Sequence, residues 1–237
     1  MKLLSLILIL IHFAFPAIAE EFKNGDMIFH TSKSSQMGAV FRATRSTFTH
    51  VGIIEVDKNG NKWVIEAIGP VTRKPFDQWV KEGIGDKYAV HRKSGITKEQ
   101  GEKVVEKAKE FWKQKLPYDK QFSFDNGSKT YCSELVEMAY KAADLKIGKR
   151  QKISELSLSG AQIEKLLNER WKEHPACKGA KALKDCVDKV LDSYLISPYG
   201  LTMTTDESST EEVFSNFTYA DAGRAYLGIP PKRPARR

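Results

Sequence analysis

A lone cysteine at the start of a predicted helix is the side chain in this sequence that could perform covalent chemistry. Cys132 follows turn-forming residues at 125–128, and the apolar residues after it recur at near-helical spacing: Leu135, Val136, Ala139, Ala142 and Ala143. We therefore place Cys132 in the first turn of a helix, where unpaired backbone N–H groups and the helix dipole stabilise a nucleophilic thiolate. The alternative is a small side chain buried at a helix start, because free cysteines are often buried.

A cysteine nucleophile needs a base, and histidine usually supplies it. His50 lies near the start of a predicted strand, two residues before Gly52, which has no side chain to crowd an approaching group. His30 and His91 fall at predicted strand ends, where we expect ordinary surface roles, and His174 lies in a later helical segment. His50 is therefore the candidate base.

The pairing of two strands decides what lies beside that histidine. If Gly60 is a left-handed bulge residue, Asp57 pairs with Asn61. Glu66 then lies diagonally beside His50 on the same face of the sheet. A two-residue turn that ends at Gly60 would instead move Glu66 to the opposite face. We favour the first register because it gives the imidazole a carboxylate to orient it. The alternative for Glu66 is a solvated strand carboxylate.

The elements that must hold these groups predict a mixed fold. The expected strands are 25–30, 48–56, 61–68 and 87–92; the expected helices are 37–45, 98–115 behind the N-cap Thr97, the helix that begins near Cys132, and 160–171. Gly69 and Pro70 end the third strand, and Phe76 and Asp77 are predicted to lead into a linking segment that contains Trp79. Residues from about 151 to 197 are predicted to be a helical insert. This pattern indicates an α+β fold in which an antiparallel sheet packs against the helix that carries the cysteine.

The beginning of the chain predicts export. A basic residue precedes a short apolar run, and Ala17 and Ala19 supply a small-residue cleavage site. The run is too short to span a membrane comfortably, and no later segment is apolar enough to do so. We expect a cleaved signal peptide at 1–19, a single domain at 20–230 and a basic tail at 231–237, in a periplasmic or secreted protein.

Net charge and cysteine content indicate which binding partners and which covalent bonds to expect. The formal net charge is +8, which suits an anionic cell wall or membrane surface, and no nucleic-acid recognition motif appears. Cys177 and Cys186 are nine residues apart, and we expect a disulfide between them in an oxidising compartment. Cys132 is the third cysteine, and an unpaired thiol in an exported protein is a candidate reactive group. The sequence lacks metal-ligand spacing, so we predict no metal and no other cofactor.

Short blocks around these residues give the sequence a family resemblance. The blocks are 25–29, 49–53, 65–67, 118–119 and 131–136, with weaker matches at 197–199 and 214–216. In this order they resemble the YiiX/YebB-like branch of the permuted NlpC-type, papain-like cysteine hydrolases, in which the histidine precedes the polar residue and the cysteine. The resemblance implies a circularly permuted papain-like fold with Cys132 as nucleophile, His50 as base and Glu66 as orienting residue.

The resemblance also implies a reaction. A cysteine hydrolase of this kind cleaves an amide bond through an acyl-enzyme, and the predicted export favours a cell-wall-type peptide or peptidoglycan fragment as substrate. Tyr118 and Asp119, or residues 32–36, would line the substrate pocket; turn capping and strand-end packing are the alternative roles for them. The segment at 154–195 is unlike the family core, which leaves the substrate open.

Other functions fit the same residues. Related permuted folds act on lipids, so a lipid acyl thioesterase or acyltransferase is one alternative. A wide apolar groove at the site would favour it, whereas paired charged groups that hold amino-acid termini would favour a peptide. A non-catalytic cell-wall-binding module is another, and a His50 rotated away from Cys132 would favour that. The plainest alternative is a structural exported protein with a buried cysteine.

Overall fold

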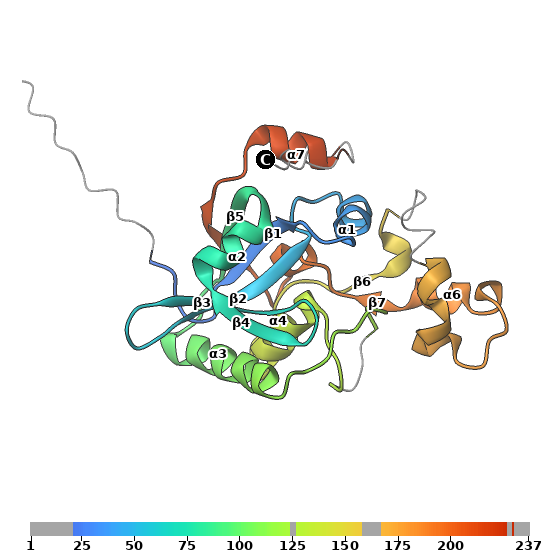
Figure 1. Ribbon diagram of the computed structural model, residues 1–237, viewed down its shortest axis with the longest axis horizontal. Helices are drawn as coiled ribbons and strands as arrows, with labels where there is room; N and C mark the ends of the chain where they lie inside the picture. Colours follow the sequence, from blue (N-terminus) through green and yellow to red (C-terminus); the bar gives the residue numbers. More distant parts are fainter. Residues whose placement is uncertain (1–20, 124–126, 158–166, 227–228, 230–237) are drawn as a thin grey trace, which may run out of the picture.

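One antiparallel sheet positions most of the groups discussed above. The computed structural model describes residues 21–123, 127–157, 167–226 and 229 (Figure 1). The predicted signal peptide and basic tail therefore lie outside the described residues, as does most of the helix expected at 160–171.

The sheet has six strands in the order β4-β3-β2-β1-β5-β8, and all neighbours are antiparallel. The strands are β1 (Met27–Ser32), β2 (His50–Val56), β3 (Lys62–Ala67), β4 (Val71–Pro75), β5 (Gly83–Lys93) and β8 (Thr210–Ser215). The helices are α1 (Met37–Thr44), α2 (Phe76–Glu82), α3 (Lys98–Lys113), α4 (Cys132–Lys141), α6 (Val187–Asp192) and α7 (Tyr219–Tyr226).

The region predicted as a linking segment is instead ordered structure. α2 occupies it, so that prediction was wrong, and β4 lies just before it where no element was predicted. β4 is an edge strand whose central residues, Thr72, Arg73 and Lys74, are only partly buried. Charged residues on edge strands are common because they discourage pairing with other chains. The strand therefore lacks the apolar alternation by which strands are found in a sequence.

Alternating side chains give the sheet two apolar faces. α3 and α4 lie side by side (Figure 1) and cover one face, where Phe29, Ile53 and Ile65 are fully buried. α2 covers the other face with the buried Trp79. The predicted cap of α3 is confirmed, because Thr97 forms a capping box at its start. The architecture is the expected α+β arrangement, with the sheet packed on the cysteine helix.

The β2–β3 hairpin has the register that places Glu66 beside His50. The backbone N–H of Asp57 donates to the carbonyl of Asn61 at 2.9 Å, and Gly60 has a φ of +80°. That conformation is easily adopted by glycine. The structure thus confirms the left-handed bulge and excludes the two-residue turn.

The insert, residues 151–197, is built differently from the sheet. Its ends pair as β6 (Gln151–Lys152) and β7 (Tyr194–Leu195). Besides α6, its described part contains short 3₁₀ turns at Ile153–Glu155, Trp171–Glu173, Pro175–Cys177 and Leu183–Asp185. The predicted Cys177–Cys186 disulfide is present and packs in a small apolar cluster with Ile153 and Val190. A segment with so small a core benefits from a covalent link.

Candidate active site

α4 begins at Cys132, which places the thiol in the first turn of the helix as expected. The carbonyl of the N-cap residue Tyr131 accepts a hydrogen bond from the N–H of Leu135 at 2.9 Å. The carboxyl group of Glu134 hydrogen-bonds back to the Tyr131 backbone and to the Thr130 side chain. Cys132 is 6% exposed. Its sulfur therefore lies where the N–H groups of the helix start stabilise a negative charge.

The start of α4 is also tied to the end of the insert. The hydroxyl of Tyr131 accepts a hydrogen bond from the N–H of Ile196 at 3.1 Å. The hydroxyl of Ser133 donates to the Ile196 carbonyl at 2.7 Å. The two neighbours of Cys132 thus fix the nucleophile relative to the segment that leaves the insert.

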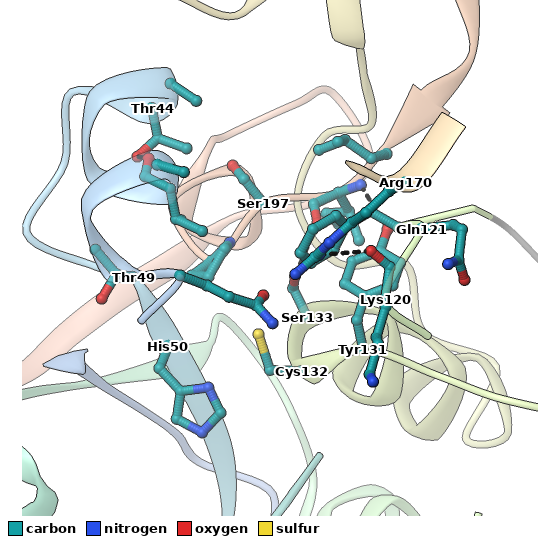
Figure 2. Close-up of a pocket in the computed structure, with 18 of the residues that line it drawn as sticks. Thr44, Thr49, His50, Lys120, Gln121, Tyr131, Cys132, Ser133, Arg170 and Ser197 are labelled. Carbon is teal, nitrogen blue, oxygen red and sulfur yellow. Dashed lines mark hydrogen bonds between the residues drawn. The ribbon is translucent and has the colours of Figure 1, made fainter. Parts of the chain in front are cut away.

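His50 is the first residue of β2, and its ring lies between a carboxylate and the thiol. Nε2 is 2.5 Å from Oε2 of Glu66, and the ring also hydrogen-bonds with the Cys132 side chain. Because Nε2 is engaged, Nδ1 is left for the sulfur. Figure 2 shows Cys132 and His50 next to each other. Burial alone lowers the pKa of His50, but the hydrogen bonds with Cys132 and Glu66 raise it to about 10. The site therefore stabilises a charged imidazolium.

Glu66 is fully buried and is held by three side chains. Besides His50, the indole N–H of Trp79 donates to Oε2 at 2.7 Å, and Nζ of Lys74 lies 2.7 Å from Oε1. Lys74 also pairs with Glu82 at 2.9 Å. Burial alone raises the pKa of Glu66, but the hydrogen bonds and charges of His50 and Lys74 lower it to about 2. The carboxylate is therefore ionised and fixed in orientation at neutral pH.

Gly52 lets β3 come close enough for this contact. A Cβ atom at position 52 would collide with a methyl group of Val64 and would lie 3.1 Å from the carbonyl oxygen of Ile65. The same atom would be 3.5 Å from Cβ of Glu66. Glycine is therefore needed between the base and its carboxylate for a close strand approach.

The surface roles expected for His30 and His91 are wrong. His30 is 2% exposed, lies cross-strand from His50, and stacks on Trp79 with ring centroids 3.9 Å apart. Burial and the charge of His50 lower the pKa of His30, so that its ring is neutral. His91 packs edge-on against Phe29, and burial lowers its pKa to about 4. β1 and β5 are interior strands of the sheet, so their ends are covered.

The two predicted substrate residues have different surroundings. Tyr118 lines the cavity beside Cys132. Asp119 is fully buried; its carboxylate accepts hydrogen bonds from the backbone and hydroxyl of Ser123 at 2.7 and 2.9 Å, and pairs with Lys129 at 2.9 Å. These contacts match the turn-capping alternative for Asp119. A substrate-binding role for it remains a prediction.

A cavity of about 180 Å³ opens beside Cys132 and His50 (Figure 2). It lies between α1, the loop at 118–122 and the insert. Most of its lining is apolar, with Ala39, Val40, Ala43, Ile68, Phe122, Ile153, Leu156, Leu167, Trp171, Val190, Leu195 and Ile196 among the wall residues. Part of the predicted 32–36 segment also contributes, through Ser32, Ser34 and Gln36.

The structure brings Cys132, His50 and Glu66 together, but sequence reasoning missed the residues that support them. Trp79 fell in the supposed linking segment and Lys74 lies just before it, and no local motif marks either residue. Their roles come from β4 and α2 folding over β3. The apolar walls contributed by the insert were likewise not found.

The sequence also matches a known protein family. Residues 21–188 match the model of a family described as permuted papain-like amidase enzymes, YaeF/YiiX, C92 family. The chain belongs to this family. It is therefore a cysteine hydrolase of the amidase type with a permuted papain-like fold, and the resemblance inferred from the sequence is confirmed. The family is related to the NlpC group but is not identical to it.

Two relatives make the similarity concrete. The chain is 38% identical over 158 residues to the protein YiiX of Escherichia coli K12, covering 66% of this chain and 76% of that protein. It is also similar to the crystal structure of the metalloprotein YiiX from Escherichia coli O157:H7, with a TM-score of 0.66 and 32% identity, covering 81% of this chain and 97% of the other.

Metal coordination is another chemistry that His, Cys, Asp and Glu side chains can support. Within the described residues, there is no group of three or more His, Cys, Asp or Glu side chains that could hold a metal ion. The same part of the chain contains no helix long and apolar enough to cross a membrane.

Proposed function

We propose that this protein is an exported cysteine amidase that cleaves its substrate through an acyl-enzyme on Cys132. The observation that carries the proposal is the continuous contact from Glu66 through His50 to Cys132, at a helix start and beside a cavity. A nucleophile, a base and an orienting group in this order are the parts that thiol hydrolysis requires.

The chemistry follows from the positions of these groups. Cys132 gives its proton to His50, and the sulfur forms a bond to the amide carbonyl carbon. The backbone N–H of Cys132, at the first turn of α4, stabilises the oxyanion. His50 then protonates the amide nitrogen, the carbon–nitrogen bond breaks, and the amine leaves. Water attacks the thioester while His50 accepts its proton, and the carboxylic acid is released.

Glu66 acts through His50. By accepting the hydrogen bond from Nε2, it directs Nδ1 toward the sulfur and stabilises the imidazolium that forms. Lys74 and Trp79 occupy the remaining positions on the carboxylate and hold it in place.

Export and the nature of the substrate are proposed from other observations. The signal peptide is supported by the sequence pattern, and a cell-wall-type peptide by that predicted address and by the amide chemistry of the family. An acyl thioesterase or acyltransferase is the second candidate, because the cavity is lined mainly by apolar side chains. A binding module without turnover has less support, since His50 is not rotated away from Cys132.

The pH dependence of iodoacetamide alkylation, read by mass spectrometry for each cysteine, tests the nucleophile. We expect Cys132 to react rapidly below about pH 7 and to slow at least about tenfold in His50→Ala, because the imidazolium holds the thiolate. His91→Ala is the matched control, since His91 is half-buried away from the cavity. An unreactive Cys132, or equal rates in all three proteins, would remove the basis for the hydrolase mechanism.

A further inference from the structure

The acyl half of the substrate is indicated by the walls of the cavity. We infer that the cavity beside Cys132 holds an apolar acyl chain, so that the preferred substrate is an N-acyl amide rather than a peptide with charged ends. This inference deepens the proposed function and rests on it.

The positions of His50 and Cys132 decide which half of the substrate enters the cavity. His50 must protonate the leaving amine, so the amine leaves on the side of the imidazole. In Figure 2, His50 lies on one side of Cys132, and Arg170 of the insert lies on the other. The acyl group stays bonded to the sulfur after the amine has left. It therefore extends toward the insert.

The walls on that side are apolar. The insert contributes Leu167, Trp171, Val190 and Leu195 to the lining, and Phe122 belongs to the loop at 118–122. Such walls gain free energy when they exclude water with a hydrocarbon chain. Ile68, which also lines the cavity, is 48% exposed and offers an apolar rim at which a chain can enter.

Charged groups suited to a peptide terminus are scarce in this cavity. Among the described lining residues there is no aspartate or glutamate, so a free amino group would find no counter-charge there. The His50 imidazolium at the cavity is already paired with Glu66. Of the lysine and arginine side chains in the described lining, Lys120 is exposed and Arg170 already donates to the Lys120 carbonyl at 2.7 Å. The lining thus matches a chain without charge.

The contact between α1 and the insert limits the length of that chain. The N–H of Ser157 donates to the carbonyl of Ala43 at 2.9 Å, so the two walls meet there. Ala43 lines the cavity and is only partly exposed. A larger side chain at this position would fill space that the acyl chain otherwise uses.

The reaction is balanced with water as the only co-reactant. Sulfur bonds to the acyl carbon as the amine leaves with a proton from His50. Water then displaces the sulfur from the acyl carbon. The products are a carboxylic acid with an apolar chain and free Cys132.

Rates of Cys132 alkylation test whether the cavity binds an apolar chain, and they do not require the protein to hydrolyse a substrate. Iodoacetamide and its N-hexyl analogue are reacted with the intact protein, and the rate at Cys132 is divided by the rate of the same reagent with glutathione. We expect the normalised rate to be at least about tenfold higher for the N-hexyl reagent, since each buried methylene is worth up to about fourfold. A ratio near one would overturn the inference.

Ala43→Phe sharpens the test, with Ala220→Phe as the matched control because Ala220 is an exposed residue of another helix, α7. We expect the N-hexyl advantage to fall at least about fivefold in Ala43→Phe and to persist in Ala220→Phe. The circular dichroism spectra of both variants should match that of the parent protein, which shows that they are folded. An N-hexyl advantage equal in both variants would contradict a chain in the cavity.

Hydrolysis separates this inference from the proposed function. Coumarin amides of acetic and octanoic acid are compared with a coumarin amide of a dialanine that has a free amino terminus. The inference predicts the octanoyl amide to have the highest kcat/KM, by at least about tenfold. Faster cleavage of the dialanine amide would support the amidase and overturn the acyl chain. No cleavage together with a large N-hexyl advantage would reject the amidase and retain an apolar-chain binding site.

Discussion

The sheet and the insert meet at the same cavity but are stabilised in different ways. In the sheet, backbone pairing of β2 and β3 places His50 and Glu66, and a buried hydrogen-bond network holds them. The insert has a two-stranded closure, short turns, a small apolar cluster and one disulfide. This difference in stabilisation corresponds to a difference in role. The sheet and α4 hold the reacting groups within narrow limits, while the insert shapes the space that the substrate occupies.

The largest expected effect comes from the buried carboxylate of the sheet. Glu66→Gln keeps the size of the side chain but cannot stabilise an imidazolium, and we expect kcat to fall by about 10³-fold. Glu82→Gln is the matched control, because Glu82 pairs with the same Lys74 but is more exposed. Its kcat should change less than about threefold. Comparable losses in the two variants would show that Lys74, rather than Glu66, is the critical group.

Acid should weaken the sheet through the same carboxylate. The pKa of Glu66 is lowered in the folded protein to about 2 from an ordinary 4.5, so its contribution to stability is present above pH 4.5 and is lost as the pH falls toward 2. The shift corresponds to about 3 kcal/mol in the free energy of unfolding. Urea unfolding at several pH values measures this loss. In Glu66→Gln the curve should be flatter over the same range, and an unchanged slope would contradict the assignment.

The smallest effect is expected from the insert. Replacing Cys177 and Cys186 by serine opens a loop of about ten residues, which costs about 2–3 kcal/mol by chain entropy. We expect this loss to appear locally, as faster proteolysis of the insert and a lower kcat/KM for the octanoyl amide. Alkylation of Cys132 by iodoacetamide should stay within about twofold of the parent. A large fall in that rate would show that the two regions are not independent.

The same contrast explains which features could be predicted from the sequence. The turn chemistry of Asp57 and Gly60 is local, so the hairpin register, and with it the meeting of His50 and Glu66, could be read from residue types. Cys132 was placed because helix starts also have local signals. Lys74 and Trp79 could not be placed, since only the pairing of β4 and the packing of α2 bring them to Glu66.

The insert was the least predictable region. Its turns are too short to give a periodic pattern, and its apolar residues look alike whether they face their own small core or the cavity. Leu195 shows the difficulty, because it both packs against the cluster around the disulfide and lines the cavity. Sequence spacing could indicate the Cys177–Cys186 bond but not the wall that the bond supports.

The pairing of β6 with β7 has a consequence for how this molecule can change. Gln151 lies opposite Leu195, so the chain enters and leaves the insert at adjacent points, and Ile196 is then fastened to Tyr131 and Ser133. The insert is therefore a segment whose two ends are held in fixed positions beside α4. Mutations that change the length or composition of the insert need not displace the Cys132 thiol. The substrate preference can therefore change during evolution while the catalytic groups stay in place.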